Sequence, residues 1–543
     1  MSGETVEQLL SEWLGRYGAE QVRLGELLCD SHRGSAAPAL VFEGSAGAEL
    51  ELSYEELGDR SARLAGALAA EGVEPGDAVA VMLRRSPETL VSALAIWRLG
   101  AVHVPLFTAF GPDAVDYRIR HCGARWAIVD AANRDKVGAE RVVVASGDGR
   151  GGRPGDLDLD EAIERGDAFE GVFRDGDDLL MLLCTSGTTG QPKAVEVPVR
   201  ALASIRSYMQ FGLDLREDDV FWNIADPAWG YGLWFGVIGP LLMGRTTLLR
   251  DVPFNPGDVY SALLRHGVTN FTGPPTMYRG LRAERPPRDF RERHRLRALS
   301  SVGEPLGGDL LEWSALELGL SIHDHYGQSE IGMVCGFAHQ PSLRREPEPG
   351  SMGTPMPGYR LAVLDGAGEG VDPGEEGELA VDVAASPLYW FRGYLRESEK
   401  TAERFPHGPG FYVTGDEVCA TGDGLLHFRS RLDDLIKSSA YRVGPFEVES
   451  ALLAHDAVFE VAVVGTPDEI RGEAVTAFVV PSADRVSGPE LADELRAFVR
   501  ARLGKHLLPR RVVFVEGLPR NPSGKVKRSD LQARWQETHA GLG

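Results

Sequence analysis

The feature that most constrains this chain is an alternation, from Tyr54 to about Tyr326, between segments of helical period and short runs that are apolar throughout. Strands have this character when helices cover both faces of their sheet. Strands that alternate with helices pair in parallel through right-handed crossovers. We therefore expect an α/β domain with parallel sheets. The apolar runs predict strands at Ala78 to Leu83, Ala101 to Pro105, Trp126 to Asp130, Leu179 to Cys184, Thr246 to Leu249 and Val268 to Phe271.

The pattern changes twice further along the chain. From about Ser351 to Ser430, short strands and Gly/Pro turns predict a smaller β-rich subdomain. After Asp433 the sequence predicts a compact α+β unit, and a chain of 543 residues is longer than one hydrophobic core usually organises. Its expected elements are a helix from Glu447, strands near Val461 to Val464 and Val475 to Val480, a helix from Pro489 to Leu503, and a strand at Val512 to Val515.

Composition restricts the partners and the compartment. A net charge of -23 disfavours a nucleic-acid partner, because such proteins need a basic surface to release counterions. Met1 to Leu14 lacks the apolar core of a signal peptide, and no run is long enough to span a bilayer. The five cysteines are widely spaced and odd in number, which fits a reducing compartment. We expect a cytoplasmic protein without nucleic-acid or membrane partners, and the sequence does not predict its oligomeric state.

The most informative segment is Leu182 to Lys193, where an apolar run ends in Thr-Ser-Gly-Thr-Thr-Gly-Gln-Pro-Lys. Glycines let backbone N–H groups converge, hydroxyls add donors and the lysine adds positive charge, so the segment is suited to hold a polyphosphate. It is not a Walker loop, because Pro192 precedes the lysine and Ala194 follows it. For such a loop taken alone, a plain Ser/Thr/Gly turn between strand and helix is the alternative.

Six segments in order resemble the adenylate-forming superfamily of acyl-CoA synthetases, luciferases and peptide-synthetase adenylation domains. The resemblance covers nearly the whole chain and is nearest to acetyl- and medium-chain acyl-CoA synthetases. It implies an adenylation domain over residues 1–430, a hinge at 431–434 and a mobile C-terminal domain over 435–543 that carries the catalytic lysine. Besides the phosphate loop, the segments are Gly303-Glu304-Pro305, Tyr326-Gly327-Gln328-Ser329-Glu330, Thr414-Gly415-Asp416, Arg431-Leu432-Asp433-Asp434 with Lys437 and Tyr441-Arg442, and Pro519-Arg520-Asn521-Pro522-Ser523-Gly524-Lys525.

The resemblance implies that the chain binds ATP and Mg²⁺. Activation of a carboxylate brings two anions together, so electrostatic stabilisation is the main task. Lys525, Lys193 and Glu330 are the implied catalytic residues, and Glu330 would place the Mg²⁺. Asp416 would accept the ribose hydroxyls and Arg431 would donate to the same sugar. The implied ATP- or AMP-binding set is Thr185, Ser186, Gly187, Thr188, Thr189, Gly190, Lys193, Gly303, Glu304, Pro305, Asp324, His325, Tyr326, Gly327, Gln328, Ser329, Asp416, Arg431, Arg442 and Lys525.

The acid substrate is expected to lie beside the segment from Asp226 to Gly232, which resembles the segment lining the substrate site in the nearest branch. The implied pocket residues are Trp229, Gly230, Tyr231, Val302 and Gly327. Acetate-specific members carry a bulky aromatic residue where this chain has Gly327. We therefore expect the glycine to deepen the pocket and acetate not to be the best substrate.

Coenzyme A is the acceptor that the resemblance implies, reached after the small domain turns about Asp433. Ala440 stands on the acceptor path, where the family usually has glycine, and overpacking at a close contact costs about 1–3 kcal/mol. The leading hypothesis is an acyl-CoA synthetase for a medium-length, branched or aromatic carboxylate. One alternative is an adenylating ligase with another acceptor, either a carrier-protein thiol or an amine, including nitrite activation for diazo formation. A second alternative, a non-catalytic nucleotide-binding relative, has no need of Lys525.

Overall fold

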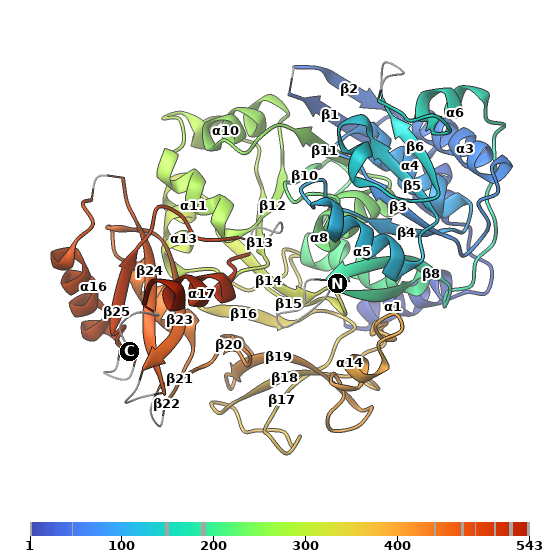
Figure 1. Cartoon of the computed structure of the whole chain (residues 1–543). Coiled ribbons are helices and arrows are strands. Elements are labelled where there is room, and N and C mark those ends of the chain that lie inside the picture. Colours follow the sequence, from blue (N-terminus) through green and yellow to red (C-terminus); the bar gives the residue numbers. More distant parts are fainter. Residues whose placement is uncertain are drawn as a thin grey trace.

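The protein is described by a computed structural model that covers residues 3–45, 47–146, 151–185, 192–438, 441–468, 472–483, 485–503, 507–520 and 525–539 (Figure 1). Within these residues the longer strands form three sheets, two in the large N-terminal part and one in the small C-terminal part. None of the helices in the same ranges combines the length and apolar character that crossing a bilayer requires.

The first sheet has seven strands, all parallel except the last, which pairs antiparallel with its neighbour. Helix α4 lies against two of its central strands, β3 and β4. The strand order is β7 (Leu157–Asp158), β6 (Arg141–Ala145), β5 (Trp126–Asp130), β3 (Ala78–Met82), β4 (Val102–Pro105), β8 (Leu179–Thr185) and β9 (Lys193–Pro198). The antiparallel pair β8–β9 encloses the predicted phosphate loop.

The second sheet has thirteen strands and changes character along its length. The strands from β14 to β1 are parallel, whereas those from β15 to β17 are antiparallel and form the β-rich part. Its order is β17 (Leu361–Leu364), β18 (Glu376–Asp382), β19 (Phe411–Ala420), β20 (Leu426–Arg431), β16 (Ser351–Pro355), β15 (Gly332–Gly336), β14 (Ile322–Gln328), β13 (Ala298–Val302), β12 (Asn270–Gly273), β10 (Val220–Asn223), β11 (Thr246–Asp251), β1 (Leu40–Gly44) and β2 (Glu49–Leu52).

The C-terminal part is built on a five-stranded sheet with its own hydrophobic core. Its strands are β22 (Tyr441–Val443), β21 (Ile436–Ser438), β24 (Gly472–Pro481), β23 (Val458–Asp468) and β25 (Arg511–Phe514), of which β25 runs parallel to β24. Figure 1 shows this sheet beside the β14–β16 region of the large domain. The expected α/β domain, β-rich subdomain and small α+β domain are confirmed.

The helices begin and end where the sequence provides local signals. In α3, the Ser53 hydroxyl accepts from the backbone of Glu56 while the Glu56 carboxylate accepts from Ser53, which satisfies two exposed donors. The helices are α1 (Gly3–Tyr17), α2 (Leu24–Leu28), α3 (Tyr54–Ala70), α4 (Pro87–Arg98), α5 (Pro112–Cys122), α6 (Leu159–Arg165), α7 (Leu202–Ser207), α8 (Gly230–Leu233), α9 (Gly239–Met243), α10 (Pro256–Arg265), α11 (Pro275–Glu284), α12 (Phe290–Arg293), α13 (Gly308–Trp313), α14 (Ser398–Ala402), α15 (Pro445–Leu453), α16 (Pro489–Arg502) and α17 (Arg528–His539).

One strand begins later than its apolar run predicts. Val268 is buried, but its N–H donates to Leu263 O and so closes the C-terminal end of α10. Gly267 has a φ of 61°, the left-handed conformation that usually ends a helix in this way. Strand β12 therefore starts at Asn270 rather than at Val268.

Candidate active site

The most buried polar group of the predicted ribose site is the carboxylate of Asp416, which is 2% exposed. Asp416 in β19 pairs with Arg431 in β20, whose guanidinium lies 3.2 Å from the carboxylate. The Tyr326 hydroxyl and the Gln328 amide, the latter at 2.9 Å, also donate to it. Burial raises the pKa of Asp416, and Arg431 opposes that shift. Three predicted segments thus meet at one carboxylate.

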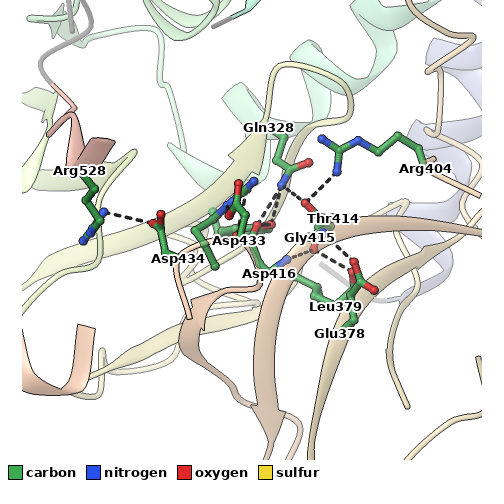
Figure 2. A network of polar contacts seen from close by, with 12 residues as sticks. Gln328, Glu378, Leu379, Arg404, Thr414, Gly415, Asp416, Asp433, Asp434 and Arg528 are labelled. Atoms are coloured by element: carbon green, nitrogen blue, oxygen red, sulfur yellow. Dashed lines mark hydrogen bonds and ion pairs between the residues drawn. The ribbon is translucent and has the colours of Figure 1, made fainter. Parts of the chain in front are cut away.

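The Thr414-Gly415-Asp416 turn is held by its neighbours (Figure 2). The Thr414 hydroxyl donates to Leu379 O at 2.8 Å, and the Gly415 N–H donates to Glu378 Oε1 at 2.9 Å. Gly415 has a φ of 79°, a conformation that favours glycine. Glu378 is not predicted from the sequence, because its position in β18 carries no signal of this contact.

A second cluster surrounds Glu330, which is buried. The Tyr394 hydroxyl donates to Glu330 Oε1 at 2.7 Å, and Arg404 Nε donates to that hydroxyl at 3.1 Å. The ammonium group of Lys193 lies 4.2 Å from the centre of the Tyr394 ring. Burial lowers the pKa of Lys193, Arg404 lowers it further, and Glu330 opposes the shift. Tyr394 therefore links the predicted metal ligand to the predicted phosphate-binding lysine.

The stem of the predicted phosphate loop is formed by Thr185 and Lys193, which pair across β8 and β9. The Thr185 hydroxyl lies 3.5 Å from Lys193 O. Ser186, Gly187, Thr188, Thr189 and Gly190 lie outside the described residues, so their predicted phosphate contacts stay predictions.

The predicted adenine side lies where β13 ends. Gly303 has a φ of 90°, and Val302 and Pro305 on either side are partly exposed. In neighbouring β14, Asp324 is buried, and its Oδ1 has no hydrogen-bond partner within the described structure. Burial raises the pKa of this carboxyl well above its usual range. Hydrogen bonds from the backbone of Leu306 and His325 and from the Ser301 side chain oppose that shift.

The predicted acid segment places Trp229 and Tyr231, both partly exposed, at the start of α8. A Cβ on Gly230 would lie 3.7 Å from the Ser329 hydroxyl, so this segment adjoins the Tyr326 to Glu330 motif. The Tyr231 hydroxyl lies 3.0 Å from the hydroxyls of both Tyr208 and Thr272. Burial raises the pKa of Tyr231 to about 12.

His325 belongs to the same buried polar network. Its Nε2 lies 2.9 Å from Phe337 O and its Nδ1 lies 2.7 Å from the Tyr208 hydroxyl. Burial lowers the pKa of His325 to about 3, so the ring is neutral. A neutral ring must donate from Nε2 to the carbonyl and accept at Nδ1. Both ring nitrogens are thereby engaged within the protein, and the predicted place of His325 in the ATP- or AMP-binding set stays a prediction.

Gly327 lies where β14 and β15 pack closely. A Cβ there would lie 2.1 Å from Gly332 O and 2.8 Å from Met333 Cα, both in the backbone of β15. The pairing of β14 and β15 is irregular between Tyr326 and Gly327. Glycine at this position permits the close approach of two strands, and its predicted role in deepening the acid pocket stays a prediction.

The small domain brings Lys525 to the site formed by the large domain. Lys525 is an exposed residue, and burial of its ammonium group among neighbouring side chains lowers the pKa of that group. Arg431 lowers that pKa further, while the carboxylates of Asp416, Glu304 and Glu330 oppose the shift. Lys525 therefore lies within electrostatic reach of all three carboxylates.

The predicted hinge is tied to this site. Arg431 Nε lies 3.2 Å from Asp433 Oδ1, and Arg528 Nη1 lies 3.3 Å from Asp434 Oδ2 (Figure 2). Ala440 and the side chain of Arg442 lie outside the described part of the structure, so their predicted roles stay predictions.

Three further residues of the site were not predicted from the sequence: Glu378, Tyr394 and Arg404. Tyr394 and Arg404 come from an irregular segment between β18 and β19, where neither hydrophobic period nor motif singles them out. Their contacts with Glu330 and Thr414 O depend on how that segment folds back over the large domain.

Comparison with known proteins agrees with this arrangement. Residues 30–395 match the family described as AMP-binding enzyme, and residues 447–525 match the AMP-binding enzyme C-terminal domain. The chain is 34% identical over 518 residues to acyl-coenzyme A synthetase ACSM3, mitochondrial, of Mus musculus, covering 92% of this chain and 87% of the relative.

Two solved structures resemble the whole chain. The crystal structure of the Brucella canis acyl-CoA synthetase has a TM-score of 0.77 and 42% sequence identity, covering 98% of both chains. The ATP-bound structure of MatB from Rhodopseudomonas palustris has a TM-score of 0.83 and 30% identity, covering 96% of this chain and 100% of the other. The chain therefore belongs to the AMP-binding family of ATP-dependent, adenylate-forming acyl-CoA ligases.

Proposed function

We propose that this enzyme activates a medium-length, branched or aromatic carboxylic acid as an acyl-adenylate and then transfers the acyl group to coenzyme A. The observation that supports this most is the 3.8 Å approach of Arg520, five residues before Lys525 in the small domain, to Glu304 in the large domain, which brings the segment carrying Lys525 to the predicted site. A nucleotide-binding protein without catalysis gains little from such a cation, whereas the joining of two anions requires one.

The first step forms a bond between a carboxylate oxygen and the α-phosphorus of ATP and breaks the bond to pyrophosphate. Lys525 is proposed to offset the charge where the two anions meet, and Lys193 the charge on the departing phosphates. Asp416 and Arg431 are proposed to hold the ribose, since a carboxylate accepts from hydroxyls and a guanidinium donates to them. In the second step the thiol of coenzyme A attacks the acyl carbon and AMP leaves.

A divalent cation fits beside Glu330. Among the described residues, no group of three or more His, Cys, Asp or Glu side chains could hold a metal ion by itself. Mg²⁺ is commonly held by one or two carboxylates together with nucleotide phosphates, and Glu330 with bound ATP would meet that requirement. When bound, Mg²⁺ supplies positive charge to the phosphate oxygens.

The size class of the acid rests on Gly327, where acetate-specific relatives carry a bulky aromatic residue. The Asp226 to Gly232 segment, which resembles that of acetyl- and medium-chain relatives, leaves Trp229 and Tyr231 partly exposed beside it. Cytoplasmic location stays a prediction, and the mouse relative is named as a mitochondrial protein.

The test is pyrophosphate release with a panel of acetate, hexanoate, isobutyrate, benzoate and nitrite, each with and without coenzyme A. We expect hexanoate, isobutyrate or benzoate to exceed acetate, and mass spectrometry to detect the thioester with one AMP for each thioester formed. Absence of acid-dependent pyrophosphate release with every compound would overturn the activity. Adenylate trapped by hydroxylamine, with turnover indifferent to coenzyme A, would reject this acceptor and favour a carrier thiol, an amine or nitrite chemistry.

A further inference from the structure

The segment that delivers Lys525 has a defined base. Arg520 and Val526 form an antiparallel bridge, and the Lys527 N–H donates to Pro519 O at 2.8 Å. Lys525 directly precedes this base in the sequence. Whatever fixes Arg520 in space therefore also fixes the place from which the Lys525 side chain extends.

The Arg520 guanidinium lies between acidic residues of the two domains. Its Nη2 is 2.9 Å from Oε1 of Glu460 in β23, and its Nη1 is 3.8 Å from Oε1 of Glu304 in the large domain. All three side chains are largely buried, with exposed fractions of 16–23%. Partial burial makes such a contact less sensitive to screening than a surface ion pair.

Glu304 is itself held in place within the large domain. The Thr276 hydroxyl, which lies 2.8 and 2.7 Å from the two carboxylate oxygens, donates its one hydrogen to this carboxylate, and Arg279 Nη2 donates to Oε2 at 2.7 Å. Both partners come from α11. The small domain therefore docks on a carboxylate whose position is already set.

A further ion pair between the domains lies near the predicted hinge, where Arg429 of β20 is 3.8 Å from Glu447 of α15. Beside it the Phe428 and Phe446 rings pack with their centres 5.6 Å apart. Contacts so close to the turning point restrain rotation weakly. The Arg520 contact joins the domains beside the lysine itself, where a small rotation produces a larger displacement.

We infer that Arg520 is a positioning residue for adenylation, which holds the base of the Lys525 segment against Glu304 while the acid attacks ATP. This inference rests on the proposed function of Lys525. The contact belongs to the domain orientation described here, and it must break when the small domain turns for thioester formation. Arg520 should therefore act on the first half-reaction and not on the second.

The experiment measures the two half-reactions separately in wild type and Arg520→Gln. Adenylation is followed by pyrophosphate release with hydroxylamine as acceptor, and thioester formation is followed from supplied acyl-adenylate and coenzyme A. We expect kcat for adenylation to fall about ten- to a hundredfold, the range for a misplaced reacting group, with KM for ATP nearly unchanged. Thioester formation from supplied acyl-adenylate should keep its wild-type rate.

Two further variants separate positioning from folding. Glu460→Gln removes only the contact within the small domain, so a smaller loss of adenylation is expected. Combining Arg520→Gln with Glu304→Gln should slow adenylation no more than the more damaging single change, because each substitution removes the same contact between Arg520 and Glu304. Undiminished adenylation in Arg520→Gln, an equal loss in both half-reactions, or additive losses in the double variant would each overturn the inference. A wild type without adenylation would instead overturn the proposed function.

Discussion

Replacing Gly327 by alanine tests how closely β14 and β15 pack. The new methyl would lie 2.1 Å from Gly332 O and 2.8 Å from Gly332 C, whereas ordinary contacts of a Cβ begin at 3.4 Å. Because both neighbours are backbone atoms, no side chain can turn aside to make room. The strands must separate by roughly 1 Å, and overpacking of this kind costs about 1–3 kcal/mol. We expect the upper half of that range.

The displacement should also reach the nucleotide site. Tyr326 and Gln328 flank the glycine, and both donate to the Asp416 carboxylate. Spreading the strands would weaken these two hydrogen bonds, so KM for ATP should rise while the relative rates with different acids stay as in wild type. Thermal unfolding followed by calorimetry reports the stability, and pyrophosphate release reports both kinetic quantities.

The matched control is Gly410→Ala, because an added Cβ at Gly410 meets nothing within 4 Å and the residue has no positive φ. Its unfolding temperature should stay close to that of wild type. A Gly327→Ala variant with unchanged stability but a clear shift towards short acids would refute the packing argument. That result would support the prediction that Gly327 forms part of the wall of the acid pocket.

Three other predictions concern the reaction and its pH range. Lys525→Ala should abolish adenylation but leave ATP affinity, measured by calorimetry, nearly unchanged, because the charge of the lysine matters most in the transition state. Equal pyrophosphate release by the variant and the wild type would contradict this role of Lys525. Burial lowers the pKa of His323 to about 4, that of His325 to about 3 and that of His339 well below 6.5. Because these histidines are neutral in the folded protein, their contribution to the free energy of unfolding is complete above pH 6.5. Each contribution falls by about 1.4 kcal/mol per pH unit as the pH decreases from 6.5 towards the folded pKa. Equal denaturation midpoints at pH 7.5 and 5.5 would contradict these lowered pKa values. Asp433→Pro should impair thioester formation far more than adenylation, because proline fixes φ at the residue about which the small domain is proposed to turn before thioester formation. Equal losses in the two half-reactions would argue against a hinge at Asp433.

Much of the fold was predictable because its strands are buried on both faces. Trp126 to Asp130 was predicted with both ends correct, and the run at Leu179 to Cys184 differs from β8 by one residue. Residues from separate motifs lie together in the structure, since Tyr326, Gln328 and Arg431 all contact Asp416. Pairing across a sheet irregularity could not be foreseen, because it depends on which backbone atoms face Gly327.

The same limit applies to side chains that act from irregular segments. Tyr394 contacts Glu330 and Lys193 only because the chain returns over the large domain after β18, a long-range event with no local signal. The orientation of the His325 ring also has no local signal in the sequence. Its Nδ1 lies beside the Tyr208 hydroxyl, because alternate side chains of a strand point to opposite faces of the sheet.

Arg431 lies 3.2 Å from the carboxylates of both Asp416 and Asp433, so a single guanidinium contacts the predicted ribose site and the predicted hinge. A nucleotide that draws this group towards the sugar must alter the balance between domain orientations. Thermodynamic reciprocity then requires that each orientation change nucleotide affinity by the same factor. The exchange of pyrophosphate for coenzyme A and the final departure of AMP would in this way be governed by one shared cation, without a separate signal between the domains.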